Sequence, residues 1–187
     1  MKPTDEERVR AARAKVRARP SLDAVERPGT GEESVWRYPR PPRLEPLRAD
    51  IAVALDAIPV ARSRRAWRVV ETSSPPVVYL PEDDLLDVRL HDRDERALCE
   101  WKGWSTYVDL EVGGRLIAKA GWRFHEPFDD LGQGYVRLCG LVALFPELFR
   151  CRIDGVTATA QDGGYYGGWI TPAVKGPFKG GPGTKDW

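Results

Sequence analysis

The chain has 187 residues, in which 29 Lys and Arg nearly cancel 28 Asp and Glu to leave a net charge of +1. This length suits one domain with extensions, and the balanced charge gives no overall field that would attract nucleic acid or an anionic membrane. Cys99, Cys139 and Cys151 contain no Cys-x-x-Cys pair, which favours a reducing compartment and gives no metal-ligand spacing. The chain begins without the apolar core of a signal peptide, and its longest apolar run, LCGLVALF, is too short to span a bilayer. We therefore expect a cytoplasmic protein.

Residues 4–19 predict a charged N-terminal helix, because Thr4 can cap it and Glu7 can complete a capping box. Its apolar stripe of Val9, Ala12 and Val16 is narrow, so we expect a helix that is solvated or weakly docked. A basic tail that binds RNA or a partner is the alternative. Residues 20–34 contain Pro and Gly and predict a linker. The sequence therefore predicts a charged helix and linker at 1–34 and the folded domain at 35–187.

Strand patterns dominate the middle of the chain. WRYPRPPRLEP (36–46) predicts extended chain, with Trp36 and Tyr38 free to pack onto the domain. Strands are expected at 51–55, 58–61, 66–72 and 77–81, with turns at 56–57 and at the Ser-Ser-Pro-Pro segment 73–76. Pro81 is followed by three acidic residues, which predicts a helix start and a run that ends near Leu90 in the polar HDRDE segment. The β core is expected at about 50–160.

The segment YVDLEV-GG-RLIAKAGWRF predicts a hairpin that turns at Gly113-Gly114. A two-residue turn places Leu110 opposite Ile117, Tyr107 opposite Ala120 and Ser105 opposite Trp122. Alternation then puts Tyr107, Trp122 and Phe124 on one face among the small residues Ser105, Ala118 and Ala120. A strand at 141–145 and a hairpin at Asp154-Gly155 follow, and the Gly- and Pro-rich tail at 163–187 is expected to wrap the surface.

Large aromatic rings that stand among small residues leave a hollow that a planar or cationic ligand could occupy. The alternative is that neighbouring elements fill the hollow and the rings are core. CEWKG (99–103) extends the same strand, so Trp101 and Cys99 share this face only if alternation survives Gly103. The same parity puts Lys102 on the opposite face unless Gly103 marks a bulge. Lys102 could contact a carboxylate or phosphate, or it could be an exposed cation.

Other residues with reactive side chains give weaker signals. Cys99 could be a nucleophile if a neighbour lowered its pKa, and a buried inert cysteine is the alternative. ARSRRAWR (61–68) could meet phosphate, but its arginines divide between two strand faces and favour a solvated edge. His91 and His125 are the chain's two histidines and have no ligand spacing, so we predict no metal site. No cofactor is predicted, because no Gly-rich loop precedes a lysine-bearing helix.

The segments ESVWRYPRPPRLEP, RVVETSSPPVVYLP, CEWKG, AGWRF and GGYYGGWITPAVKGPFKGGPGTKDW, in this order, resemble the bacterial and fungal family called domain of unknown function 427. The resemblance covers residues 33–187. It implies a β-rich domain similar to the β-tent folds, which include the drug-binding domain of cereblon and recognise a small ring in an aromatic cage. Many β-tent proteins also hold zinc with paired cysteines, which this sequence lacks. Ser74, Leu98 and Val78 replace a histidine, a histidine and an aromatic residue that are common in the family.

The fold class expected from sequence is therefore α+β, mostly antiparallel β, in one compact β-tent-like domain. The leading hypothesis is a small-molecule pocket with aromatic walls, in which Glu71 and Lys102 are polar contacts. The alternatives are an enzyme that uses Lys102, Cys99 or Glu71, for which some family labels suggest nucleotidyl transfer, and a protein-interaction module whose arm at 1–47 docks a partner. No Gly-Ser and paired-carboxylate signature for two magnesium ions supports the transferase label. The predicted ligand-binding residues are Glu71, Tyr79, Trp101, Lys102, Tyr107 and Trp122.

Overall fold

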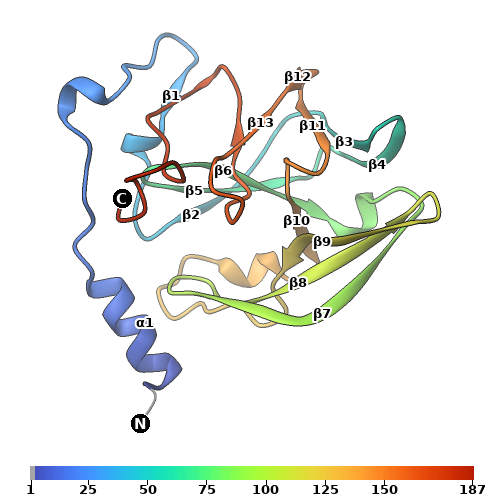
Figure 1. Cartoon of the computed structure of the whole chain (residues 1–187), viewed down its shortest axis with the longest axis horizontal. Helices are drawn as coiled ribbons and strands as arrows, with labels where there is room; N and C mark the ends of the chain where they lie inside the picture. The colour runs from blue at the N-terminus through green and yellow to red at the C-terminus, as the bar shows by residue number, and fades with distance from the viewer. Residues whose placement is uncertain (1–2) are drawn as a thin grey trace.

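A computed structural model describes residues 3–187 as one α-helix and four β-sheets (Figure 1). Residues 1 and 2 of the predicted N-terminal extension lie outside the described residues. Nearly all strand pairs are antiparallel, so the α+β class with mostly antiparallel strands is confirmed. In the described part of the chain, no helix is long and apolar enough to cross a membrane.

The largest sheet has seven antiparallel strands in the order β2-β5-β6-β10-β9-β8-β7. Their bounds are β2 Arg43–Pro46, β5 Trp67–Glu71, β6 Ser74–Pro81, β7 Val88–Cys99, β8 Gly103–Val112, β9 Arg115–Arg123 and β10 Leu141–Leu144. The turn between β5 and β6 is shorter than the predicted Ser-Ser-Pro-Pro turn, because Ser73 takes a φ of 74° and β6 already begins at Ser74. The central strand β10 is apolar and buried at every position, and β6 is apolar after Ser74, which fits strands that are covered on both faces.

A four-stranded sheet in the order β12-β11-β3-β4 packs against one face of the large sheet. Its strands are β3 Ile51–Leu55, β4 Ile58–Ser63, β11 Arg150–Ile153 and β12 Val156–Thr157, and they form the two hairpins predicted at 56–57 and 154–155. The core between the sheets takes alternate residues of the large sheet, such as Val78 and Leu80 of β6. The intervening residues, such as Tyr79, therefore face the other side, where a second cluster of buried residues includes Phe124 and Tyr135.

The C-terminal segment wraps the molecule as expected and adds very short strands. β13 Thr159–Ala160 pairs with β14 Trp169–Ile170, and β15 Val174–Lys175 pairs in parallel with β1 Glu33–Ser34. Trp169 is buried in the core between the two large sheets. Trp36 and Tyr38 pack onto the domain as predicted, and Trp36 meets Trp187 edge to face at a centroid distance of 5.3 Å. Short 3-10 helices lie at Leu22–Ala24, Val35–Arg37, Glu82–Asp84 and Tyr135–Leu138.

The N-terminal helix α1, Asp5–Ala14, begins with the predicted capping box of Thr4 and Glu7 but ends five residues before the predicted Arg19. Val9 is buried, whereas Val16 is 91% exposed and has no surface to pack against. Arg17 instead turns back, donating to the carbonyl of Ala12 at 3.1 Å and to the Glu100 carboxylate at 2.7 Å. The Ala12 carbonyl in the last turn also accepts from the backbone N–H of Lys15 at 3.3 Å, so the early end of the helix leaves this group paired.

The predicted helix after Pro81 is wrong. Glu82–Asp84 form only a short 3-10 turn, and the polar HDRDE segment lies within the twelve-residue strand β7 at the edge of the large sheet. Cross-strand contacts explain why so polar a segment forms a strand: Arg93 forms an ion pair with Asp109 at 2.7 Å, and His91 Nε2 lies 3.2 Å from the Glu111 carboxylate. Charged side chains on an edge strand also discourage pairing with another chain.

The predicted hairpin at Gly113-Gly114 is confirmed, and Leu110 lies opposite Ile117 as expected. Beyond this pair the predicted register is wrong, because a bulge shifts it by two residues and places Tyr107 opposite Trp122. Lys119 forms the bulge with a φ of +49°, and its backbone N–H donates to the Asp109 carboxylate at 2.7 Å. No glycine marks this position, so the alternation pattern alone could not reveal it.

Candidate functional site

The CEWKG segment forms the turn between β7 and β8. Cys99 pairs with Gly103, so Glu100, Trp101 and Lys102 form the turn and leave the strand. Gly103 has a φ of +88°, and an added Cβ would lie 2.9 Å from the ring of Phe128. Trp101 and Lys102 therefore do not alternate between the two faces of the sheet as expected, because the strand begins only at Gly103.

A cavity of about 220 Å³ lies beside this turn, against the face of the large sheet that carries Tyr79. Four separate stretches of chain contribute to its wall: β5–β6, the β7–β8 turn with β8, the end of β9, and residues 161–179. Five of the six predicted ligand-binding residues line it: Glu71, Tyr79, Lys102, Tyr107 and Trp122.

Trp101 is the predicted residue that does not line the cavity. Its side chain is 7% exposed and packs in the buried cluster with Val69 and Leu138. The guanidinium of Arg13 in α1 lies 5.5 Å from the Trp101 ring centroid, within the range of a cation–π contact. Trp101 therefore joins the N-terminal helix to the turn that carries Lys102.

The aromatic wall is centred on Tyr79 and Trp122. Their rings meet at 90° with a centroid distance of 6.3 Å, and Trp122 Nε1 donates to the Tyr79 hydroxyl oxygen at 3.1 Å. Burial raises the pKa of Tyr79 to about 12, although Lys102 and the Trp122 hydrogen bond act to lower it. The hydroxyl therefore keeps its proton at neutral pH. Among residues 3–187 no acceptor takes that proton, so it remains free for a ligand.

The loop Gly163–Gly168 covers the Trp122 side of the cavity. A Cβ at Gly167 would lie 2.2 Å from Trp122 Cη2, so the backbone rests directly on the indole and leaves no room for a side chain. Tyr165 and Tyr166 from the same loop line the cavity, and their rings meet edge to face at 5.3 Å. Tyr165 remains 57% exposed, which places it at the mouth of the cavity.

Lys102 places a cation at the cavity wall. Burial lowers the pKa of its ammonium group, but the electrostatic influence of the neighbouring Cys99, Tyr79 and Glu71 raises it more, so the net pKa lies above the ordinary value for lysine. Lys102 therefore keeps its charge at neutral pH. A second cation, Lys179, also lines the cavity, and its Nζ donates to the backbone oxygen of Trp187 at 2.9 Å. Burial lowers the pKa of Lys179.

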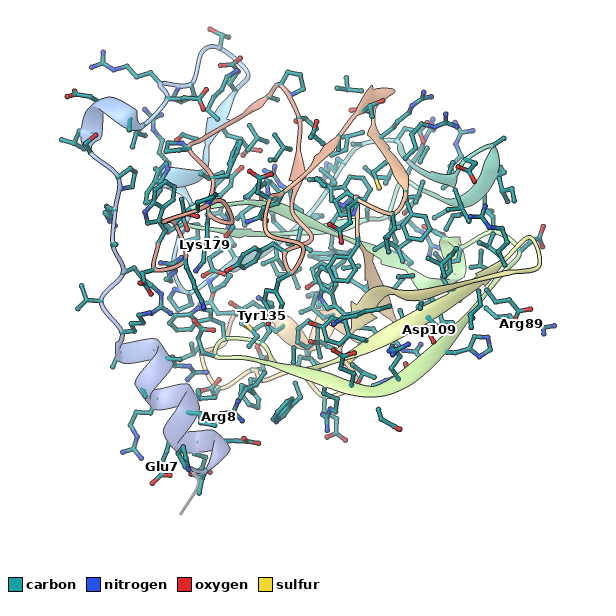
Figure 2. The ribbon with its side chains drawn as sticks, in the orientation of Figure 1. Glu7, Arg8, Arg89, Asp109, Tyr135 and Lys179 are labelled. Atoms are coloured by element: carbon teal, nitrogen blue, oxygen red, sulfur yellow. The ribbon has the colours of Figure 1, made fainter. Side chains whose placement is uncertain are left out.

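In Figure 2, Lys179 lies at the end of the molecule nearest α1, while Arg89 marks the far end of β7. The cavity therefore belongs to the end at which the N-terminal helix, the β7–β8 turn and the C-terminal segment meet (Figure 1). Within the described residues, no three His, Cys, Asp or Glu side chains are grouped as metal ligands.

Sequence reasoning missed Gln161 and four cavity residues in the tail: Tyr165, Tyr166, Gly167 and Lys179. The tail was expected to wrap the surface, but it has no periodic pattern that could say where it would lie. The signal that could have found them is the GGYYGG segment itself, since a loop of glycines around two tyrosines suggests close backbone approach to another aromatic group.

The sequence was also compared with known proteins. A family model described as a domain of unknown function, DUF427, matches residues 43–158, which span the strands from β2 to the start of the C-terminal segment. No curated protein matches the sequence. The cavity lies largely within the matched region, although Gln161, Tyr165, Tyr166 and Lys179 lie beyond it.

Proposed function

The chain belongs to the DUF427 family, which is defined by a domain of unknown function, and we propose that it binds a small ring-shaped molecule in the aromatic-lined cavity. The observation that carries this proposal is the convergence of aromatic rings and polar groups from four distant stretches of chain on one cavity. Ligand sites combine apolar walls with a few convergent polar groups in this way.

The size of the cavity favours a single ring. Its volume is about 220 Å³, and a cavity of about 150 Å³ is known to hold benzene. A six-membered ring with one small substituent is therefore the size of ligand that fits. Such a ring can lie against Trp122 and Tyr107, which are directly opposite each other on β9 and β8.

The state of Lys102 favours binding over amine chemistry. A lysine that acts as a nucleophile or general base must lose its proton, whereas the surroundings of Lys102 raise its pKa above the ordinary value. In this proposal Lys102 is a binding contact, and Glu71 is a polar residue of the wall held by Arg40 at 2.9 Å.

We extend the proposal to a cytoplasmic protein without nucleic-acid or membrane partners. The arginines of the ARSRRAWR segment support this, because Arg62 and Arg64 contact Asp50, and Arg68 contacts Glu45 at 2.6 Å. Paired arginines are less available to phosphates. A gel-shift titration with single- and double-stranded RNA and DNA should show no complex at physiological salt, and a complex under those conditions would refute this part.

The proposed function can be tested by ligand-observed NMR with a library of single-ring compounds at millimolar concentration. The wild-type protein is compared with Gly167→Leu, whose side chain collides with the Trp122 ring and displaces this wall of the cavity, and with Thr157→Leu, an exposed control on β12. Saturation transfer to some ring compounds is expected in the wild type and the control, and its loss is expected in Gly167→Leu.

Circular dichroism establishes that each variant is folded. If Gly167→Leu does not fold, competition between two bound rings in the wild type replaces it, because a single cavity predicts mutual displacement. Equal binding by Gly167→Leu and the wild type, or the absence of any ring binder, contradicts the proposal.

A further inference from the structure

The cavity wall contains four charged side chains: Glu71, Glu100, Lys102 and Lys179. Counted alone, their charges cancel. The ion-pair partners of these side chains decide the net charge of the wall, because an ion pair within the protein leaves little charge for a ligand to meet.

Each carboxylate of the wall is paired with an arginine. Arg40 Nε donates to Glu71 at 2.9 Å, and Arg17 Nη2 donates to Glu100 at 2.7 Å. All four side chains of these two pairs are less than one quarter exposed, so the pairs are only weakly screened by solvent. Each acid of the cavity wall is therefore neutralised by its own arginine.

Lys102 has no such partner. Within the described part of the chain, no Asp or Glu carboxylate oxygen lies within 4.0 Å of its ammonium group. Lys179 Nζ already donates to the main-chain oxygen of Trp187, the last residue of the sequence, at 2.9 Å. Lys102 therefore gives the cavity wall a positive charge that no side-chain carboxylate offsets. The Tyr79 hydroxyl adds a proton donor that has no acceptor.

From this arrangement we infer that the cavity selects a ring that carries an anionic group, such as an aromatic carboxylate, over the neutral analogue of the same shape. This inference rests on the proposed function and names its ligand class. The ring lies against Trp122 and Tyr107, and the carboxylate accepts from Lys102 with Tyr79 or Lys179 as a further donor. A ring cation is disfavoured, because Lys102 repels it.

Pairs of acids and amides test the inference, since they share shape and differ in charge. Benzoate and benzamide, nicotinate and nicotinamide, and 2-furoate and 2-furamide are titrated by calorimetry at constant pH and ionic strength. A charge-assisted hydrogen bond in a partly desolvated site predicts that at least one acid binds about tenfold more tightly than its amide. Raising the salt concentration should reduce that ratio.

Lys102→Met removes the charge at nearly constant volume and should abolish the preference for the acid while retaining amide binding. Lys185→Met removes an exposed lysine outside the cavity wall and should leave the preference unchanged. If Lys102→Met does not fold, Lys179→Met and the salt dependence of the wild-type ratio decide the question.

The outcomes separate the two claims. If amides bind as tightly as their acids, or if the acid preference survives in Lys102→Met, the inference is overturned and the proposed ring-binding function stands. If some ring compounds bind but none of the acids does, the inference also fails. If neither acids nor amides nor any other ring compound binds, the proposed function fails and the inference fails with it.

Discussion

The two ends of strand β8 differ in how they are built. At one end the Gly113–Gly114 turn joins neighbouring strands, and Leu116 beside it is 63% exposed. At the other end the Glu100–Lys102 turn is held by α1, which lies beside it in Figure 1, and by loops that follow β9. Arg13 Nε of α1 donates to the Glu100 carbonyl at 2.7 Å, and Phe128 donates its backbone N–H to the Lys102 carbonyl at 3.0 Å.

This difference shows which contacts create the cavity. The Gly113–Gly114 turn meets the β3–β4 hairpin at Ile58 and through the exposed Arg115–Asp56 pair, yet Leu116 remains largely in solvent. The Glu100–Lys102 turn is held partly by a segment 83 residues away in the chain, the one carrying Arg17. Such contacts bury part of Lys102, whose pKa stays above the ordinary value although burial acts to lower it.

The largest expected difference between the two ends is in stability. Trp101→Ala removes a side chain that is 7% exposed, and it should lower the free energy of unfolding by about 3–5 kcal/mol. Leu116→Ala at the other end removes an exposed side chain and should change it by less than about 0.5 kcal/mol. Urea unfolding followed by circular dichroism measures both. Equal losses would show that the two turns are equally integrated in the fold.

A smaller effect is expected for the ion pairs at the two ends. Arg17 and Glu100 are 15% and 23% exposed, so Arg17→Ala should cost about 1–2 kcal/mol of stability, between the values for exposed and buried pairs. It also leaves the Glu100 carboxylate unpaired at the cavity wall, so acid binding should weaken. Arg115→Ala breaks the exposed pair with Asp56 and should cost at most about 0.5 kcal/mol.

Calorimetry with benzoate on these two arginine variants sharpens the comparison. We expect the affinity for benzoate to fall in Arg17→Ala and to stay unchanged in Arg115→Ala. If truncation at position 17 destabilises the protein but leaves acid affinity unchanged, the N-terminal arm supports the fold and has no influence on the charge of the cavity.

The smallest expected effect is on the stability of the fold at low pH, and it comes from Asp84, which is outside the cavity wall. Asp84 accepts a hydrogen bond from Ser63 Oγ at 2.6 Å and pairs with Arg65. Burial acts to raise its pKa, but the bonds from Arg65 and Ser63 outweigh burial and hold the pKa below the usual range. A carboxylate with a lowered folded-state pKa stabilises the protein above its unfolded pKa of about 4 and loses that contribution as pH falls through the folded value.

Asp84→Asn should therefore lower stability at pH 7 and flatten the decline in stability below about pH 4. Thermal unfolding of both proteins between pH 3 and pH 7 checks this. Parallel pH profiles for the wild type and Asp84→Asn would show that Asp84 does not contribute to acid sensitivity.

The sequence correctly predicts the structural features that depend on residues close together in the chain. The capping box at Thr4, the hairpin turns and the pairing of Leu110 with Ile117 follow from short-range patterns, and the structure confirms them. The strand β7 was mistaken for a helix start and a polar segment because its stabilising charges, such as Asp109, lie on another strand. The bulge at Lys119 was missed for the same reason, since its N–H is held by Asp109 across the hairpin.

The same distinction between local and long-range contacts applies to the residues of the candidate site. Tyr107 and Trp122 of the hairpin could be chosen from sequence because alternation places them on one face, whereas Tyr79 of β6 was chosen with the help of the family resemblance. Lys102 lines the cavity only because Gly103 ends a turn, and Lys179 lines it only because the tail folds back over the sheet. Trp101 was expected in the wall because the turn was interpreted as strand, and the structure places its ring in the core beneath Arg13.

The most direct test of the account is a crystal structure of the protein with the tightest-binding acid. We predict that the ring lies between Tyr107 and Trp122, with its carboxylate within hydrogen-bond distance of Lys102 Nζ. A ring bound outside this cavity, or bound inside it with the carboxylate turned away from both Lys102 and Lys179, would contradict the account.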